Sequence, residues 1–182
     1  MVKRCFWVEN QEEIYLKYHD EEWGVPVYDD HLLYEQLILE SFSAGLSWLI
    51  ILKKRENFRK AFDNFDIDKV IAYDEAKVET LMQDKGIVRS RAKILATISN
   101  SKIIKDIQKE YGSFSNYLWG YTNHEIIYPG DVTLTKSELS DCIAKDLKKR
   151  GMKFCGSVTI FAYLQAVGIV NSHEPSCFKY GK

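Results

Sequence analysis

Hydrophobic and polar positions along most of the chain repeat with the period of an α-helix rather than that of a β-strand. Apolar residues recur three and four positions apart, and only three prolines interrupt the sequence. The pattern therefore predicts an all-α protein. We expect helices over about 30–44, 46–62, 67–72, 75–83, 90–109, 135–150 and 157–167, with an aromatic segment over 114–121.

Short polar residues stand in front of several of these apolar runs, where a side chain can accept hydrogen bonds from free backbone N–H groups. The expected caps are Asp29 or Asp30, Asp66 and Asp74. Thr135 and Glu138 have the spacing of a capping box at the start of another helix. Residues 123–134, which include Pro129-Gly130-Asp131, are expected to form the one long loop.

The composition is that of an ordinary globular protein, with 46% hydrophobic and 28% charged residues. A length of 182 residues fits a single helical domain over 1–182. Because no 18 uncharged apolar residues run together and no leader-like stretch opens the sequence, we expect a cytoplasmic protein with no membrane partner. In that reducing compartment the four cysteines are better suited to be free thiols or metal ligands than disulfides.

The net charge of −1 gives no global basic field, so DNA binding would need a local patch. Basic clusters occur at 53–55, 89–93 and 145–153, although such a run is usually a solvated face. The last cluster joins two predicted helices through a connection framed by Gly151 and Gly156. Its backbone amides and its lysines, among them Lys149 and Lys153, are suited to hold a phosphate.

Glu40 lies in an unusually apolar predicted helix. At about 100° per residue it shares a narrow sector with Leu33, Leu37 and Ala44 rather than with Glu35, which predicts burial. A buried carboxylate is paired, protonated or part of a functional site. Glu40 is therefore a candidate catalytic residue, and a capped or salt-bridged structural glutamate is the alternative.

Two pairs of residues, Cys5 with His19 and His173 with Cys177, each offer one thiolate and one imidazole. The second pair has the spacing of one helical turn, which suits a shared tetrahedral ion, and the first pair would complete a Cys₂His₂ shell. Four protein ligands leave no open position, so such a metal would be structural. Ordinary core thiols and surface histidines are the alternative.

Several strings that run nearly from end to end are specific when taken together. They are Arg4-Cys5, Tyr15, Tyr18-His19-Asp20, Glu22 to Pro26, Glu40, Ala44 to Trp48, Leu52 to Arg55, Asp146 to Gly151 and Lys153-Phe154. With these residues the chain resembles the 3-methyladenine DNA glycosylase I family of the helix-hairpin-helix glycosylase superfamily. The resemblance implies a helix-hairpin-helix glycosylase fold and a monomeric, monofunctional enzyme that hydrolyses the N-glycosidic bond of 3-methyladenine in double-stranded DNA.

The resemblance also implies roles for individual residues. It implies that a structural Zn²⁺ joins residues 1–25 to 168–182 through Cys5, His19, His173 and Cys177. It implies a base pocket formed by Glu40 with Trp7, Tyr15, Tyr18 and Trp48. It implies a hairpin at about 148–158 that grips the DNA backbone through Lys149, Gly151, Lys153 and Gly156, preceded by the segment 85–94.

These residue types suit a cationic base. Methylation at N3 leaves adenine positively charged and its glycosidic bond weakened, so discrimination is a harder task than supplying a strong acid. Stacking on Trp48 and charge-assisted hydrogen bonds to Glu40 would favour the cation over neutral adenine. Relatives in the superfamily carry an aspartate after the hairpin, but residues 170–173 of this chain contain no carboxylate, which leaves Glu40.

Two features depart from the family pattern. Phe42 stands where members generally carry glutamine, two residues after the pocket glutamate, and the segment 123–140 is shorter than usual. Two other functions also fit parts of the sequence. A non-catalytic DNA- or RNA-binding protein would have no reason to bury Glu40, and a metal-dependent hydrolase would need an open metal position that a Cys₂His₂ set denies.

Overall fold

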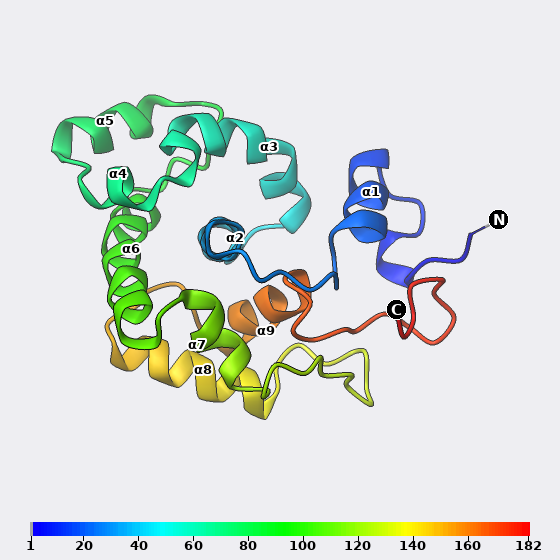
Figure 1. Ribbon diagram of the computed structural model, residues 1–182. Coiled ribbons are helices and arrows are strands. Elements are labelled where there is room, and N and C mark those ends of the chain that lie inside the picture. The colour runs from blue at the N-terminus through cyan, green and yellow to red at the C-terminus, as the bar shows by residue number, and fades with distance from the viewer. Residues whose placement is uncertain (1) are drawn as a thin grey trace.

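The computed structural model describes residues 2–182, and in that part of the chain helices are the only extended regular structure (Figure 1). The two 3₁₀ helices are η1 (Phe6–Val8) and η2 (Asp63–Phe65). The α-helices are α1 (Glu13–Glu21), α2 (Asp30–Ser43), α3 (Trp48–Ala61), α4 (Ile67–Ile71), α5 (Glu75–Gln83), α6 (Arg91–Tyr111), α7 (Phe114–Gly120), α8 (Glu138–Lys149) and α9 (Ser157–Ala166). The all-α prediction is confirmed.

Helix α2 lies at the centre of the molecule, seen end-on in Figure 1, with α3, α6, α7 and α9 packed around it. It is buried on nearly every side because apolar residues occupy half of its positions and neighbouring helices also cover Glu35, Glu40 and Ser41. The buried sector predicted for this helix, which included Glu40 and excluded Glu35, is therefore too narrow. Glu40 is buried with 7% of its surface exposed, but Glu35 is buried as well, at 6%.

Three helices begin at the predicted caps. Asp29 accepts the first-turn N–H of α2, while its neighbour Asp30 accepts the N–H groups of Phe114 and Ser115 and so fixes the start of α7. Asp66 and Asp74 cap α4 and α5 as expected.

The predicted capping box of α8 is wrong by two residues. Ser137 is the cap, its hydroxyl accepts the Ser140 N–H, and the Ser140 hydroxyl accepts the Ser137 N–H. Thr135 lies outside the helix, and Glu138 is its first residue. A serine at the third helical position performs the return bond that the motif usually assigns to Glu or Gln.

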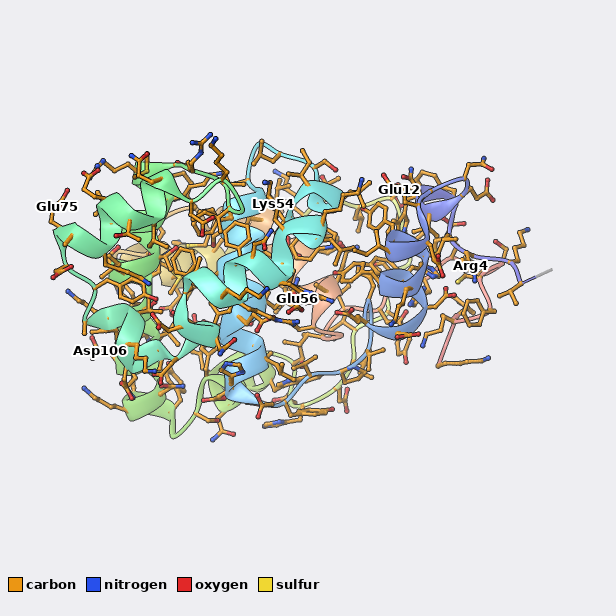
Figure 2. All side chains as sticks on the ribbon, turned by 90° about the horizontal axis from the view of Figure 1, so that it is seen from above. Arg4, Glu12, Lys54, Glu56, Glu75 and Asp106 are labelled. Atoms are coloured by element: carbon orange, nitrogen blue, oxygen red, sulfur yellow. The ribbon has the colours of Figure 1, made fainter. Side chains whose placement is uncertain are left out.

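The pattern did not predict η1 and α1. These elements carry few aliphatic residues and the cap of α1, Glu12, makes no side-chain cap bond. They are positioned instead by tertiary contacts with the carboxyl-terminal segment, where Phe178 N–H donates to the Lys3 carbonyl. Both termini consequently lie at one end of the molecule, and Figure 2 shows Arg4 and Glu12 there, opposite Glu75 and Asp106.

Candidate functional site

A pocket of about 340 Å³ lies between α1, α2, α3 and the carboxyl-terminal segment. Helix α2 supplies Glu40, α3 begins with Trp48, and η1 and α1 supply Trp7, Tyr15 and Tyr18. These five residues are the ones that the resemblance assigns to the base pocket. The pocket is also lined by Phe6, Trp23, Val132, Thr133, Ala162, Gln165, Ser172 and Glu174.

The aromatic rings of the pocket form a continuous wall. Trp7 packs against Tyr15 with ring centroids 5.0 Å apart, Tyr15 is followed by Tyr18 at 6.3 Å, and Tyr18 meets Trp48 at 5.5 Å. The indole N–H of Trp48 is buried and has no hydrogen-bond partner within residues 2–182. Planar faces in such a wall are suited to stack on a flat heteroaromatic ring.

Glu40 carries the only buried carboxyl group of this pocket. The Gln36 amide donates a hydrogen bond of 3.0 Å to its Oε1 atom. Burial raises the pKa of Glu40 to about 8, and the Gln36 hydrogen bond opposes that rise without cancelling it. With no cation beside it, Glu40 is therefore mostly protonated at neutral pH, and a cation placed there would favour its ionised form.

Several polar residues of the pocket were not predicted from the sequence. Gln165 donates to the Ser172 hydroxyl at 2.9 Å, and Glu174 accepts the Phe6 backbone N–H at 2.9 Å. Thr133 comes from the long loop, where Asp131 accepts its N–H and its hydroxyl proton. These residues lie in or beside irregular segments, so no periodicity in the sequence could reveal that they meet at one pocket.

Cys5, His19, His173 and Cys177 are buried, and their ligand atoms all lie within 4.8 Å of one another. The distances are 3.5 Å from Cys5 Sγ to His173 Nδ1, 3.6 Å from Cys177 Sγ to His173 Nδ1, and 3.6 Å from Cys177 Sγ to His19 Nε2. Such a cluster can hold a metal ion. The predicted reason for the His173 and Cys177 spacing is wrong, because their segment forms turns and not a helix.

The outer atoms of this Cys/His cluster are also fixed. His19 Nδ1 bonds to Asp20 at 2.8 Å, Asp20 in turn accepts the Arg4 guanidinium, and His173 Nε2 bonds to the Trp23 carbonyl at 3.1 Å. Burial lowers the pKa of His173 to about 4, so its ring is neutral, as a metal-bound imidazole must be.

The cluster lies directly behind the aromatic wall. Trp7 is 5.4 Å from the His19 ring, and Trp23 is 4.7 Å from the His173 ring, measured between centroids. A shift of either histidine would therefore move side chains of the pocket.

Residues 150–156 join α8 to α9, the two helices that contact each other most extensively. Gly151 has φ +97°, a conformation that favours glycine, and Gly156 precedes α9 without a side-chain cap. Asn100 of α6 holds the connection through both backbone groups of Lys153, at 3.0 Å from its N–H and 2.8 Å from its carbonyl. Sequence reasoning missed Asn100, which nothing in its local pattern distinguishes from an ordinary helix residue.

Most basic residues of the predicted clusters 53–55 and 89–93 bind partners within the protein. Acidic partners bind Lys53, Arg55, Arg91 and Arg150. Lys93 donates to the Phe42 and Ala44 carbonyls at the end of α2. By contrast, Lys145, Lys148, Lys149 and Lys153 are exposed and form no ion pair within residues 2–182. Four exposed lysines without an ion pair thus lie on α8 and the α8–α9 connection.

Within residues 2–182, no helix combines the length and the apolar character needed to cross a lipid bilayer.

Comparison with known proteins gives one consistent family. The chain matches the family model described as methyladenine glycosylase over residues 7–180. It is 43% identical over 183 aligned residues to DNA-3-methyladenine glycosylase 1 of Escherichia coli, covering 98% of this chain and 97% of that protein. It is 40% identical to DNA-3-methyladenine glycosylase of Haemophilus influenzae, with 97% of each chain covered.

The fold agrees with the sequence comparison. The solved structure of 3-methyladenine DNA glycosylase I from Staphylococcus aureus, which concerns 3-methyladenine recognition, superposes with a TM-score of 0.93 at 37% identity. It covers 98% of this chain and 97% of that chain. The resemblance stated from the sequence is confirmed, and the chain belongs to the methyladenine glycosylase family.

Proposed function

We propose that this protein is a DNA glycosylase that hydrolyses the N-glycosidic bond of 3-methyladenine in alkylated double-stranded DNA. The observation that carries the proposal is the buried carboxyl of Glu40, set in an aromatic pocket with Gln36 as its one hydrogen-bond partner within residues 2–182. Family membership at 40–43% identity over nearly full length supports the same activity. Its substrate would place the protein inside the cell, and we expect it to act as a monomer.

The size and lining of the pocket suit one extruded base. A base in a duplex is shielded by its neighbours, so the nucleotide has to leave the stack, at a cost of roughly a few kcal/mol. Trp48 and the tyrosines then supply planar, electron-rich faces, which attract a cationic ring by about 0.5–2 kcal/mol. Neutral adenine gains less from these faces.

Glu40 adds the charge discrimination. A cation entering the pocket replaces the water that the carboxylate has lost, so it lowers the pKa of Glu40 and binds to the ionised form. Charge-assisted hydrogen bonds of this type contribute about 1.5–3 kcal/mol each. Neutral adenine beside the protonated carboxyl gains no charge-assisted hydrogen bond, and this difference in binding free energy selects the damaged base. Water then attacks C1′ of the sugar, with no covalent intermediate required.

The Cys/His cluster fits a structural Zn²⁺. Zinc bonds of about 2.3 Å to sulfur and about 2.0–2.1 Å to nitrogen give a sulfur–nitrogen edge of about 3.6 Å in a tetrahedron. Three of the four sulfur–nitrogen distances of the cluster are 3.5–3.6 Å. Bound there, the ion would supply no chemistry to the reaction and would hold together the two terminal segments behind the pocket wall.

The α8–α9 connection supports a helix-hairpin-helix role in holding the DNA backbone. Its lysines have no acidic partner within residues 2–182, and the first turn of α9 carries no side-chain cap. Backbone N–H groups and lysine ammonium groups bind phosphate irrespective of base sequence. Lys149, Gly151, Lys153 and Gly156 are the residues we assign to this contact.

Single-turnover release of 3-methyladenine from alkylated DNA tests the proposal. Glu40→Gln keeps the shape of the side chain but removes the anion, so we expect excision to fall at least about tenfold, or ~1.4 kcal/mol. A parallel thermal melt should show that the variant stays folded. Wild-type protein that binds the DNA but releases no base would instead favour the non-catalytic binding protein.

A further inference from the structure

Gln36 and Glu40 stand one turn apart on α2, where side chains four residues apart lie on the same face. Within residues 2–182 no other group forms a hydrogen bond with the Glu40 carboxyl, and the Gln36 amide has no other partner. Resting on the proposed function, we infer that Gln36 is a positioning residue. Its amide orients the Glu40 carboxylate and stabilises the anion that meets the lesion.

The position of Gln36 explains why its amide is available for this role. Gln36 lines a second cavity of about 210 Å³, and Tyr18 borders both this cavity and the aromatic pocket. The charged groups of the second cavity are already paired. Arg55 binds Glu22 through two hydrogen bonds, and Arg59 binds Glu35 in the same way. Gln36 is therefore directed to Glu40 without competition from these charges.

None of the other groups that face Glu40 forms a hydrogen bond with its carboxyl within residues 2–182. Tyr15 and Tyr18 of α1 are neutral phenols whose pKa values are raised chiefly by burial and further by the Glu40 charge. The pKa of Tyr163 of α9 is raised chiefly by burial, and its hydroxyl donates to the Leu33 carbonyl. Trp48 of α3 has no titratable group, and its indole N–H forms no hydrogen bond within residues 2–182. The nearby Glu174 side chain carries a like charge and accepts a backbone N–H. Gln36 is the one neighbour that favours the carboxylate against burial.

An amide can also bind a protonated carboxyl, because after a flip of the amide group its oxygen accepts a hydrogen bond from the carboxyl O–H. The bond to the anion is the stronger of the two because it is charge-assisted. Gln36 therefore shifts the balance toward the ionised form, and its loss should raise the pH at which Glu40 ionises. A merely structural residue would not move that pH.

The variant Gln36→Met keeps the length and helix preference of the side chain and removes the donor. We expect the pH midpoint of single-turnover 3-methyladenine release to rise by about one unit, the size expected for one hydrogen bond to an ionised group. Excision at pH 7 should then fall several-fold, while excision near pH 9.5 approaches the wild-type rate. Gln36→Ala, which also lacks the donor, should give the same shift.

Two controls separate this inference from the proposed function. Gln165→Met removes another pocket glutamine, one that bonds Ser172 and not Glu40, so whatever it does to the rate it should leave the pH midpoint where it is. Glu40→Gln should abolish the pH dependence, and adding Gln36→Met to it should change nothing further. The pKa of Glu40 in the DNA-free protein can be measured by ¹³C NMR of labelled glutamate, with Glu40→Gln identifying the signal.

Unchanged midpoints and an unchanged Glu40 titration in both Gln36 variants would overturn the positioning role while leaving the proposed function intact. If Gln36→Met does not fold, the same two readings on Gln36→Ala decide. Wild-type protein that binds alkylated DNA but releases no 3-methyladenine would refute the proposed function itself, whereas a Glu40→Gln protein that excises at the wild-type rate with the wild-type pH profile would refute only the charge-reading role of Glu40. A midpoint that rises in the Gln36 variants, and not in Gln165→Met, supports the inference.

Discussion

The Cys/His cluster and the Glu40 pocket are two adjacent buried polar sites, and they differ in how completely their buried groups are paired. In the cluster every group is matched, since the four ligand atoms converge and the outer histidine nitrogens are bonded to Asp20 and the Trp23 carbonyl. In the pocket Glu40 has one partner and a pKa raised by burial to about 8. Matched groups stabilise the fold, whereas an unmatched one is a cost to the fold that a ligand can remove.

The cluster should give the largest effect when it is broken. Cys177→Ser removes one of four ligands from a site that ties both termini together, so we expect loss of stoichiometric zinc by elemental analysis. The melting temperature should fall by about 10 °C or more, corresponding to several kcal/mol. Activity should fall as far as folding does, because the ion supplies no chemistry.

Cys142→Ser is the matched control for that experiment. Cys142 is an exposed free thiol on α8, away from the four ligands, so zinc content and melting temperature should stay at the wild-type values. A Cys177→Ser protein that keeps its metal and its melting temperature would show that the ligand assignment is wrong.

Substitution of Glu40 in the pocket should raise the melting temperature, the opposite of the effect expected at the cluster. The folded-state pKa of Glu40 lies near 8, above the ordinary value of 4.5, so the folded protein binds the proton more tightly than the unfolded chain does. This contribution to stability is fully present below pH 4.5 and is lost as pH rises through 8. Glu40→Gln removes the dependence, so its melting temperature relative to wild type should increase between pH 6 and pH 9.

Glu35 provides a control on the same helix. It is as buried as Glu40, but Arg59 binds it through two hydrogen bonds. Glu35→Gln weakens an ion pair and should lower the free energy of unfolding by about 1–3 kcal/mol at neutral pH. If both variants lost stability equally at pH 9, the distinction between matched and unmatched carboxyls would fail.

How well the sequence predicted these regions depends on the range of the interactions involved. The helices α2 to α6 follow from local periodicity and from short polar caps such as Asp66 and Asp74, which act within one turn. The sequence placed the cap of α8 at Thr135 instead of Ser137, because both residues are suitable caps and they lie two positions apart.

The site was less accessible to such reasoning. Burial of Glu40 followed from its helix, but its pairing with Gln36 depends on which neighbours are already engaged, as Arg59 is with Glu35. Thr133, Ser172 and Glu174 reach the pocket from irregular segments that only the tertiary fold brings together. The role of Asn100 likewise depends on a backbone 53 residues away.

The α8–α9 connection should show the smallest effect, because its lysines are exposed and contribute to binding alone. Reversing Lys149 and Lys153 to glutamate should weaken binding to undamaged duplex several-fold, lower the salt dependence of binding, and leave the melting temperature unchanged. Lys60→Glu with Lys69→Glu is the matched control, since both lysines are exposed on α3 and α4 and the change in net charge is the same. Fluorescence anisotropy at several salt concentrations measures both pairs. Equal weakening by the two double variants would mean that net charge governs binding. Weakening confined to the Lys149 and Lys153 variant would assign the phosphate contact to this connection. DNA affinity would then depend on different residues from the stability of the cluster and the selectivity of the pocket.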